Sequence, residues 1–359
     1  MTLDSEQFPA TKKFTYLNSP ACGLISNETH KAVLAFHEKY LESASITADD
    51  WLLNEFNEVR QVVANFLKAS LSEIALVPNF SFAYNSLLDS MGPMKTLIYK
   101  RDYPSLLMPL QLKGFELIEL DDVSGFEIQQ ELLFQKLISE KIELLVLSHA
   151  QFRTGYLTDL EAVGDFCKLH GILFIVDATQ SAGVVPISFN KLNVDALIFS
   201  NYKWMNAGFA TGVMCLKSTM IHRFKPSIAG FGSMLFENDN LVYQPSIKSY
   251  EPAHPNMSAL NGLKQAILEK EVLGMDNIRA HNQKLTSKLC EGLRQKGINY
   301  FGENAAIQDR VFVVIPSIQE RFEKLKKKDI TTTFREGYIR LGVHFYNTEQ
   351  DVQRFLDTV

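Results

Sequence analysis

Residues 171–216 constrain the fold of this chain more than any other stretch. They contain three short apolar runs rich in β-branched and aromatic residues, at 171–176, 195–199 and 212–216. Runs of this length and composition predict buried strands. The first run stops at Asp177, and the second leads into Lys203. Because the carboxyl ends of strands face the ligand crevice in open α/β sheets, we expect Asp177 and Lys203 to point into the same space.

An acid and a lysine in one crevice suit a particular class of cofactor. An aldehyde cofactor that withdraws electrons needs an amine to hold it covalently and a carboxylate to keep its ring nitrogen protonated. Lys203 and Asp177 supply both groups. Either residue alone is compatible with an acid at a strand end or a surface lysine. The pair, together with Gln180 and Ser200, favours a cofactor site.

The two segments that carry this pair resemble a known family. Residues 177–180 (DATQ) and 200–204 (SNYKW) are similar to the class V aminotransferase family of pyridoxal phosphate (PLP) enzymes. The resemblance implies the three-layer α/β fold of PLP transferases, with a mainly parallel seven-stranded sheet and a small α+β domain at the carboxyl end. It also implies catalytic roles for Lys203 and Asp177. Gln180, Ser200 and Tyr202 would contact the cofactor, Gln180 at its phenolic oxygen.

The domain division follows from the same resemblance and from the strand and helix patterns. We expect a large cofactor-binding domain at 15–255 and a small domain at 256–359, with 1–14 as an arm that joins the small domain. The first long helix should begin after Ser26 as N-cap and run to about Glu42. A second should run over 51–68, capped by Asp49 or Asp50. Residues 230–234 should form a flexible glycine-bearing loop.

A strand at 74–78 leads into residues 79–85 (NFSFAYN), which should open a helix. Free backbone amides at a helix start bind anions. The resemblance implies that the cofactor phosphate binds here, to the Ser81 hydroxyl and the Phe82 amide. An ordinary serine near a helix start remains the alternative. The segment lacks the glycine-rich pattern of a nucleotide loop.

Two aromatic residues follow predicted strands. The resemblance implies that Tyr103 stacks on the cofactor ring, although a tyrosine before Pro104 also suits a simple turn. Phe152 stands where the desulfurase branch of the family has an asparagine that touches the phenolic oxygen. Kynureninase-like members carry an aromatic residue there, so Phe152 steers the chain away from the desulfurase branch.

The substrate site is expected at both ends of the chain. Arg340 precedes a Tyr-Asn-Thr turn at 346–348, and the resemblance implies that it binds the α-carboxylate of the substrate. A planar guanidinium suits this role because it grips a carboxylate through two hydrogen bonds. An edge-strand arginine in a surface ion pair is the alternative. Ala21 and Cys22 lie in a loop that would edge the substrate pocket, or form only a tight turn.

The resemblance also implies a homodimer with shared sites. His254 stands where the family usually has a threonine that reaches the phosphate of the neighbouring subunit. We expect His254 to make that contact from the partner subunit.

Composition excludes several other classes. The 359-residue chain has 46% hydrophobic and 21% charged residues, as expected of a globular protein with a substantial core. Its net charge of −5 gives no basic footprint for nucleic acid. No apolar run is long enough for a signal or membrane segment, and the four scattered cysteines lack metal-ligand spacing. We therefore expect a cytoplasmic enzyme with reduced thiols, no bound metal, and no membrane or nucleic-acid partner.

The resemblance implies more than one reaction. We predict an aminotransferase that acts on a small α-amino acid, with a 2-oxo acid as acceptor. A lyase of the selenocysteine lyase, cysteine desulfurase or kynureninase type shares the first steps and stays open. The absence of cysteine from residues 297–359 argues against sulfur transfer through a protein persulfide. A third hypothesis is a non-catalytic binding protein that retains the fold.

Overall fold

The computed structural model describes residues 5–359 and is built around a seven-stranded sheet. The strand order is β2-β8-β7-β6-β5-β3-β4, and β8 alone runs antiparallel to its neighbours. The strands are β2 (Ile74–Val77), β3 (Lys95–Tyr99), β4 (Glu116–Leu120), β5 (Leu144–Ser148), β6 (Leu173–Asp177), β7 (Ala196–Ser200) and β8 (Gly212–Leu216). The predicted mainly parallel seven-stranded sheet is confirmed.

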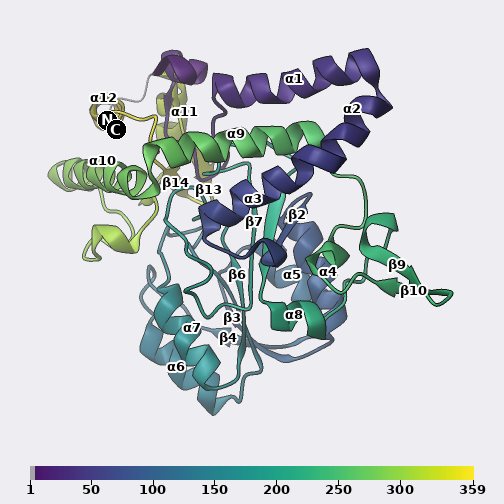
Figure 1. The fold of residues 1–359 in the computed structure, drawn as a ribbon. Helices are drawn as coiled ribbons and strands as arrows, with labels where there is room; N and C mark the ends of the chain where they lie inside the picture. The colour runs from purple at the N-terminus through teal and green to yellow at the C-terminus, as the bar shows by residue number, and fades with distance from the viewer. Residues whose placement is uncertain (1–4) are drawn as a thin grey trace.

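Helices cover both faces of this sheet and complete three layers (Figure 1). One core unites the sheet with helices on its first face, and a second core unites it with helices on the other. The first set is α1 (Asn27–Ser43), α3 (Phe56–Leu67), α6 (Gln130–Ser139), α7 (Leu160–Leu169) and α9 (Met257–Leu273). The second is α4 (Phe80–Met91), α5 (Pro104–Leu112) and α8 (Ser218–Arg223). The central strands β5, β7 and β8 are buried along their whole length, which explains their unbroken apolar sequences.

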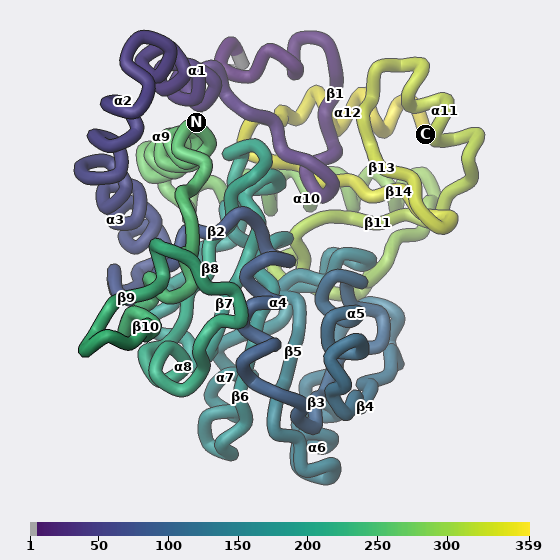
Figure 2. The backbone as a smooth tube through the Cα atoms, turned by 90° about the vertical axis from the view of Figure 1, so that its right-hand side faces the viewer, coloured from purple at the N-terminus to yellow at the C-terminus, as the bar shows by residue number. Residues whose placement is uncertain are grey.

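The carboxyl-terminal part is smaller and has its own core. Its sheet has the order β11-β14-β13 and is antiparallel. Its elements are α10 (Met275–Gln295), β11 (Val313–Pro316), α11 (Gln319–Lys327), β12 (Ile330–Thr331), β13 (Thr333–Arg335), β14 (Tyr338–Leu341) and α12 (Glu349–Thr358). Strand β1 (Thr15–Tyr16) joins this part by pairing in parallel with β12, and Figure 2 shows β1, in purple, beside the yellow carboxyl-terminal elements. The residue limits of the two domains stay a prediction.

The structure corrects two of the expected elements. Ser26 does cap α1, accepting a hydrogen bond from the Thr29 amide at 2.9 Å. The second helix, however, is not capped at Asp49 or Asp50. It begins earlier, as α2 (Ser45–Asp50), and passes through a π-helical turn (Trp51–Glu55) into α3. The turn adds a residue to the helical spiral, so a pattern read with a period of 3.6 places the start too late.

The second correction concerns the glycine-bearing segment at 230–234. It forms a short 3₁₀ turn (Phe231–Ser233) that leads into a hairpin of β9 (Met234–Glu237) and β10 (Asn240–Tyr243). The hairpin projects from the body of the molecule (Figure 1). Over the described residues, no helix is long and apolar enough to cross a membrane. All four cysteines are unpaired.

Candidate active site

A cavity of about 320 Å³ lies where β5, β6 and β7 end. Its lining brings together residues from four separate strand ends and from the start of α4. They include Ser81, Tyr103, Ser148, Phe152, Asp177, Thr179, Gln180, Ser200, Tyr202 and Lys203. Asp177 and Lys203 therefore face one space, as the sequence predicts from their positions after neighbouring strands. We call this space the lysine cavity.

Lys203 is buried yet lacks a counter-ion. Its side chain is 6% exposed, and Nζ has no hydrogen-bond or ion-pair partner among residues 5–359. Nζ lies 5.6 Å from the ring centres of both Tyr103 and Tyr202. Burial lowers the pKa of Lys203 to about 8, against the opposing pull of the Asp177 charge. A buried amine of this kind is a nucleophile near neutral pH.

Asp177 is the acid of the lysine cavity. One of its carboxylate oxygens accepts a hydrogen bond from the Thr179 amide at 2.8 Å. Burial raises the pKa of Asp177 to about 6, and the Thr179 hydrogen bond only partly offsets this effect. A cationic ring nitrogen placed against Asp177 would favour its ionised form. No cluster of three or more metal-ligating side chains occurs in the described part of the chain.

The start of α4 forms the polar end of the cavity. The Ser200 hydroxyl accepts a hydrogen bond from the Phe80 amide at 2.9 Å, which ties the end of β7 to this helix. Asn79 is the N-cap, and its side chain accepts from the Phe82 amide at 2.9 Å. The Ser81 hydroxyl has no partner among the described residues and lines the cavity.

The Phe82 amide therefore departs from its predicted role. It is already satisfied by Asn79, and the Phe82 side chain lines a different cavity. The α4 terminus keeps Ser81 as the group that could bind an anion. The cap could have been recognised, because asparagine directly before a helix is a strong N-cap residue.

Gln180 faces the lysine cavity with both ends of its amide engaged. Its Nε2 donates to the Pro20 carbonyl at 2.9 Å, and its Oε1 accepts from Trp204 Nε1 at 2.8 Å. One Nε2 hydrogen remains for a contact inside the cavity, as its predicted role requires. The two bonds also fix the amide orientation.

Two aromatic rings form the opposite wall. Tyr103 and Phe152 meet edge to face with their ring centres 5.2 Å apart, and both line the cavity. The Asp102 carboxylate holds this wall in place, accepting from the Tyr103 amide at 2.7 Å and from the Ser148 amide at 2.9 Å. Asp102 joins the loop after β3 to the end of β5. The role of Asp102 was not predictable from the sequence, because nothing in the chain order pairs it with Ser148.

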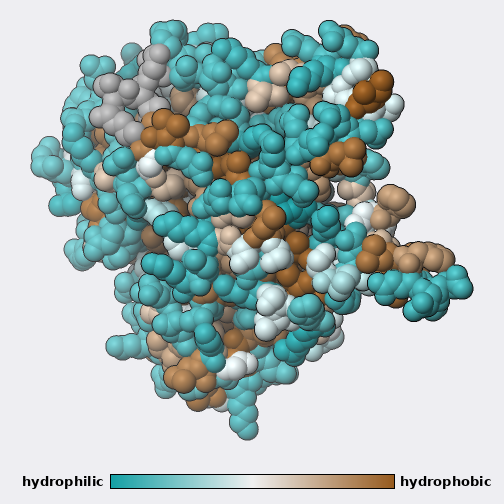
Figure 3. Space-filling view, viewed as in Figure 1, coloured by the Kyte–Doolittle hydropathy of each residue, from teal (hydrophilic) through white to brown (hydrophobic). Residues whose placement is uncertain are grey.

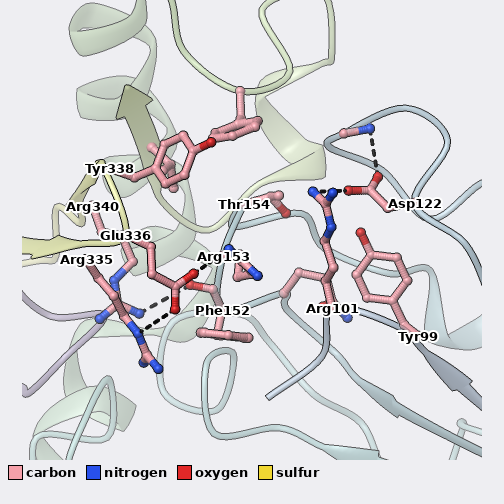
Figure 4. A pocket seen from close by; sticks show the side chains of 14 residues that line it. Tyr99, Arg101, Asp122, Phe152, Arg153, Thr154, Arg335, Glu336, Tyr338 and Arg340 are labelled. Atoms are coloured by element: carbon pink, nitrogen blue, oxygen red, sulfur yellow. Dashed lines mark hydrogen bonds and ion pairs between the residues drawn. The ribbon is translucent and has the colours of Figure 1, made fainter. Parts of the chain in front are cut away.

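Arg340 lies beyond Phe152, in a neighbouring cavity that we call the arginine pocket (Figure 4). Its Nη1 donates to the Phe152 carbonyl at 3.2 Å, and its Nε is buried without a partner among the described residues. Phe152 lines both cavities, so the two adjoin at this residue. Arg340 is thus beside the lysine cavity and not in an edge-strand ion pair.

The amino-terminal loop reaches the same region from another side. The Gly23 amide donates to the Tyr202 carbonyl at 2.9 Å, and a Cβ on Gly23 would lie 1.8 Å from the Lys203 carbonyl oxygen. Burial raises the pKa of the Cys22 thiol, while the Lys203 charge lowers it. Ala21 and Cys22 border the Lys203 segment without lining the cavity, and their substrate roles stay predictions.

His254 lies elsewhere in the same chain. It lines a cavity of about 410 Å³ with Phe82, Ile228 and Gly230, separate from the one that holds Lys203. The contact predicted for His254 therefore requires a second subunit.

Known proteins resemble this chain over most of its length. The aminotransferase class-V family model matches residues 15–355. The uncharacterized aminotransferase YcbU of Bacillus subtilis is 22% identical, covering 98% of this chain and 95% of its own. A probable cysteine desulfurase of Pyrococcus abyssi is 24% identical, covering 98% and 94%.

Solved structures of similar fold include a PLP enzyme. The apo structure of cysteine desulfurase from Thermococcus onnurineus NA1 superposes with a TM-score of 0.89 at 22% identity, covering 99% of this chain and 98% of that one. A C-DES mutant with glycine covalently linked to its PLP cofactor gives 0.90 at 19% identity, with the same coverage. The chain belongs to the class V aminotransferase family, which is PLP-dependent.

Proposed function

We propose that the protein is a PLP-dependent enzyme that acts on an α-amino acid, and that it is an aminotransferase. The observation that carries the proposal is the unpaired, buried Lys203 amine in one cavity with Asp177. A non-catalytic binding protein would have no use for a buried lysine without a counter-ion, because such burial is costly.

The residues of the lysine cavity fit the cofactor in chemistry. Lys203 would bind its aldehyde, Asp177 would pair with the ring nitrogen, and Ser81 would meet the phosphate at the start of α4. Tyr103 and Phe152 would contact the ring, while Gln180 would donate to the phenolic oxygen. Tyr202 and Ser200 would complete the binding site.

The chain's own residues also account for proton transfer. When bound, PLP withdraws electrons from the substrate Cα. Lys203 Nζ would take the proton from Cα and return it as a general acid, which requires an amine that is partly neutral near pH 7. Arg340 would hold the α-carboxylate beside Phe152, and the aromatic wall would exclude water.

A lyase reaction is the second candidate. The probable cysteine desulfurase of Pyrococcus abyssi matches as fully as the uncharacterized aminotransferase YcbU, and one similar structure is the cystine C–S lyase C-DES. Cys167, Cys215 and Cys290 are buried and residues 297–359 contain no cysteine, so a persulfide on the protein would have to form on the partly exposed Cys22. A lyase that needs no protein thiol remains compatible with the site.

The two reactions differ in whether they need an acceptor. The cofactor-loaded enzyme should be incubated with single amino acids, with and without pyruvate or 2-oxoglutarate. Transamination predicts a 2-oxo acid from the donor and a new amino acid from the acceptor. Alanine, pyruvate or sulfide released without any acceptor would instead establish the lyase. Loss of all turnover in Lys203→Ala is expected in either case.

We further propose a homodimer in the cytoplasm. Support for the dimer comes from the β9–β10 hairpin, whose apolar side chains Phe236 and Leu241 are 74% and 63% exposed. Figure 3 shows hydrophobic colouring on the hairpin that projects from the molecule. A patch of this kind suits a subunit interface. His254 lies in the cavity next to the same segment, so a second subunit could bring it toward a neighbouring Ser81.

A further inference from the structure

The arginine pocket carries more positive charge than its own carboxylates neutralise. Four arginines line it, together with two acids. The arginines are Arg101, Arg153, Arg335 and Arg340, and the acids are Asp122 and Glu336. Two positive charges are therefore left over. An uncompensated charge beside an apolar wall attracts an anion.

The ion pairs show where the surplus lies. Arg101 is matched by Asp122 at 2.9 Å, and that carboxylate also accepts from the Gly125 amide. Arg153 and Arg335 both pair with the single carboxylate of Glu336 (Figure 4). Arg340 has no carboxylate partner within residues 5–359. The surplus therefore lies at Arg340 and on the Arg153–Arg335 pair.

Strand register puts the two centres of surplus charge side by side. In the β13–β14 hairpin, Arg335 stands opposite Tyr338 and Thr333 opposite Arg340. Directly opposed residues share a face, and residues two apart on one strand also share it. Arg335 and Arg340 are thus diagonal neighbours on the face that lines the pocket. The Arg335 charge contributes to lowering the pKa of Arg340, second to burial.

Both arginines contact Phe152, the residue that lines both cavities. The Arg335 guanidinium lies 5.6 Å from the Phe152 ring centre, and Arg340 donates to the Phe152 carbonyl. One small molecule that starts at Lys203 could therefore extend past Phe152 and meet both. The pocket holds about 50 Å³, where one water needs about 10–15 Å³. That space admits a short chain with a terminal carboxylate.

We propose that the substrate is an acidic α-amino acid, with a side-chain carboxylate one or two methylenes beyond Cα, together with the matching 2-oxo acid. Arg340 holds the α-carboxylate, and Arg335 with Arg153 holds the side-chain carboxylate. This inference rests on the proposed function, since it assigns the substrate class of the same site. Phe152 lies between the end of the substrate that would react at Lys203 and the end whose carboxylate the arginines would bind.

The first test measures binding without turnover. Succinate and glutarate are compared with butyrate and valerate, their monocarboxylate analogues, by titration calorimetry on the cofactor-loaded enzyme. The dicarboxylates should bind about tenfold more tightly, in keeping with one additional charge-assisted contact. Equal affinity for both classes would overturn the proposal.

Two variants with opposite expected effects on dicarboxylate affinity distinguish loss of recognition from loss of structure. Arg335→Gln should remove the preference for dicarboxylates and leave monocarboxylate binding unchanged. Glu336→Gln should strengthen dicarboxylate binding, because it frees the two arginines that share this acid. Arg321→Gln is the charge-matched control, since Arg321 lies on α11 outside the pocket and donates only to Pro316. An unchanged preference in Arg335→Gln, or weaker dicarboxylate binding in Glu336→Gln, would refute the assignment.

A kinetic comparison distinguishes this inference from the proposed function. Glutamate should exceed glutamine as amino donor in kcat/KM, and aspartate should exceed asparagine. Transamination with no preference for the acidic donors would overturn the inference while the aminotransferase proposal stands. Selective dicarboxylate binding without any amino transfer would sink the aminotransferase proposal and leave the acidic ligand class in place.

Discussion

Lys203 differs from an ordinary lysine in its surroundings and not in its chemistry. Two tyrosine rings have their centres 5.6 Å from the amine, and Asp177, the acid of the same cavity, accepts a hydrogen bond from the Thr179 amide instead. The amine is thus desolvated without a matching ion pair. This combination lowers the pKa of the amine toward neutral pH, as the proposed reaction with an aldehyde requires.

The rate of cofactor loading should report this shift. Because only the neutral amine attacks the aldehyde, the loading rate should rise with pH and level off above about pH 8, the pKa of Lys203. Cofactor-free protein mixed with PLP, followed by visible absorbance at a series of pH values, measures it. Lys203→Ala should give no such phase. A rate that keeps rising to about pH 10.4, the pKa of a solvated lysine, would contradict the account.

Some site residues were predictable because local sequence determines where they lie. Asp177 and Lys203 each follow an apolar run, and neighbouring strand ends meet at one edge of the sheet. The engagement of Phe82 was not predictable from the family pattern, because the Asn79 side chain competes for its amide. Arg335 escaped attention because its position beside Arg340 depends on the register of a hairpin between them.

At the scale of elements, one buried ion pair joins three of them. Arg60 on α3 donates two hydrogen bonds to the Glu251 carboxylate, at 2.7 and 2.9 Å, and a third to the Ile74 carbonyl. Glu251 also accepts a hydrogen bond from the Leu76 amide, so this backbone donor on the edge strand β2 is satisfied. The pair therefore fixes α3, β2 and the segment that leads to His254.

Removing one partner of the Arg60–Glu251 ion pair should lower the free energy of unfolding. Arg60→Met leaves the Glu251 carboxylate buried without a counter-ion, and we expect a loss of about 3–5 kcal/mol in the free energy of unfolding. The double variant Arg60→Met with Glu251→Gln should recover part of this loss, since no bare charge remains. Denaturant titrations at fixed protein and cofactor concentration measure both. Equal stability of the two variants would contradict the argument.

Two elements were not predicted correctly, each for its own physical reason. The π turn at Trp51–Glu55 shifts the helical phase, which a search for a regular period cannot follow. The β9–β10 hairpin carries exposed apolar residues, so its strands do not alternate between a core face and a water face. The strands of the main sheet other than β4 were predictable within a residue or two because burial on both faces leaves a continuous apolar run.

For the whole molecule, the hairpin supports a specific expectation about assembly. Phe231, at its base, is 97% exposed and Phe236 is 74% exposed. If these rings lie in a subunit interface, Phe231→Asp with Phe236→Asp should shift the protein from dimer to monomer, because burying the new charges is unfavourable. Light scattering after size exclusion gives the mass. Leu169→Asp, at the exposed end of α7, should leave it unchanged. A dimer that persists in the double variant would place the interface elsewhere.

The pairing of β1 with β12 bears on how the polypeptide matures during synthesis. Thr15 aligns with Ile330, and the Ser19 hydroxyl lies 2.6 Å from that of Tyr346. The ribosome synthesises β1 long before β12, so β1 cannot form this pairing until synthesis is nearly complete. His344, which is also synthesised late, has its Nε2 3.0 Å from the carbonyl oxygen of Trp204, the residue after Lys203. Truncated products would therefore lack the His344 contact that supports the Lys203 segment. The site would be complete only at the end of synthesis.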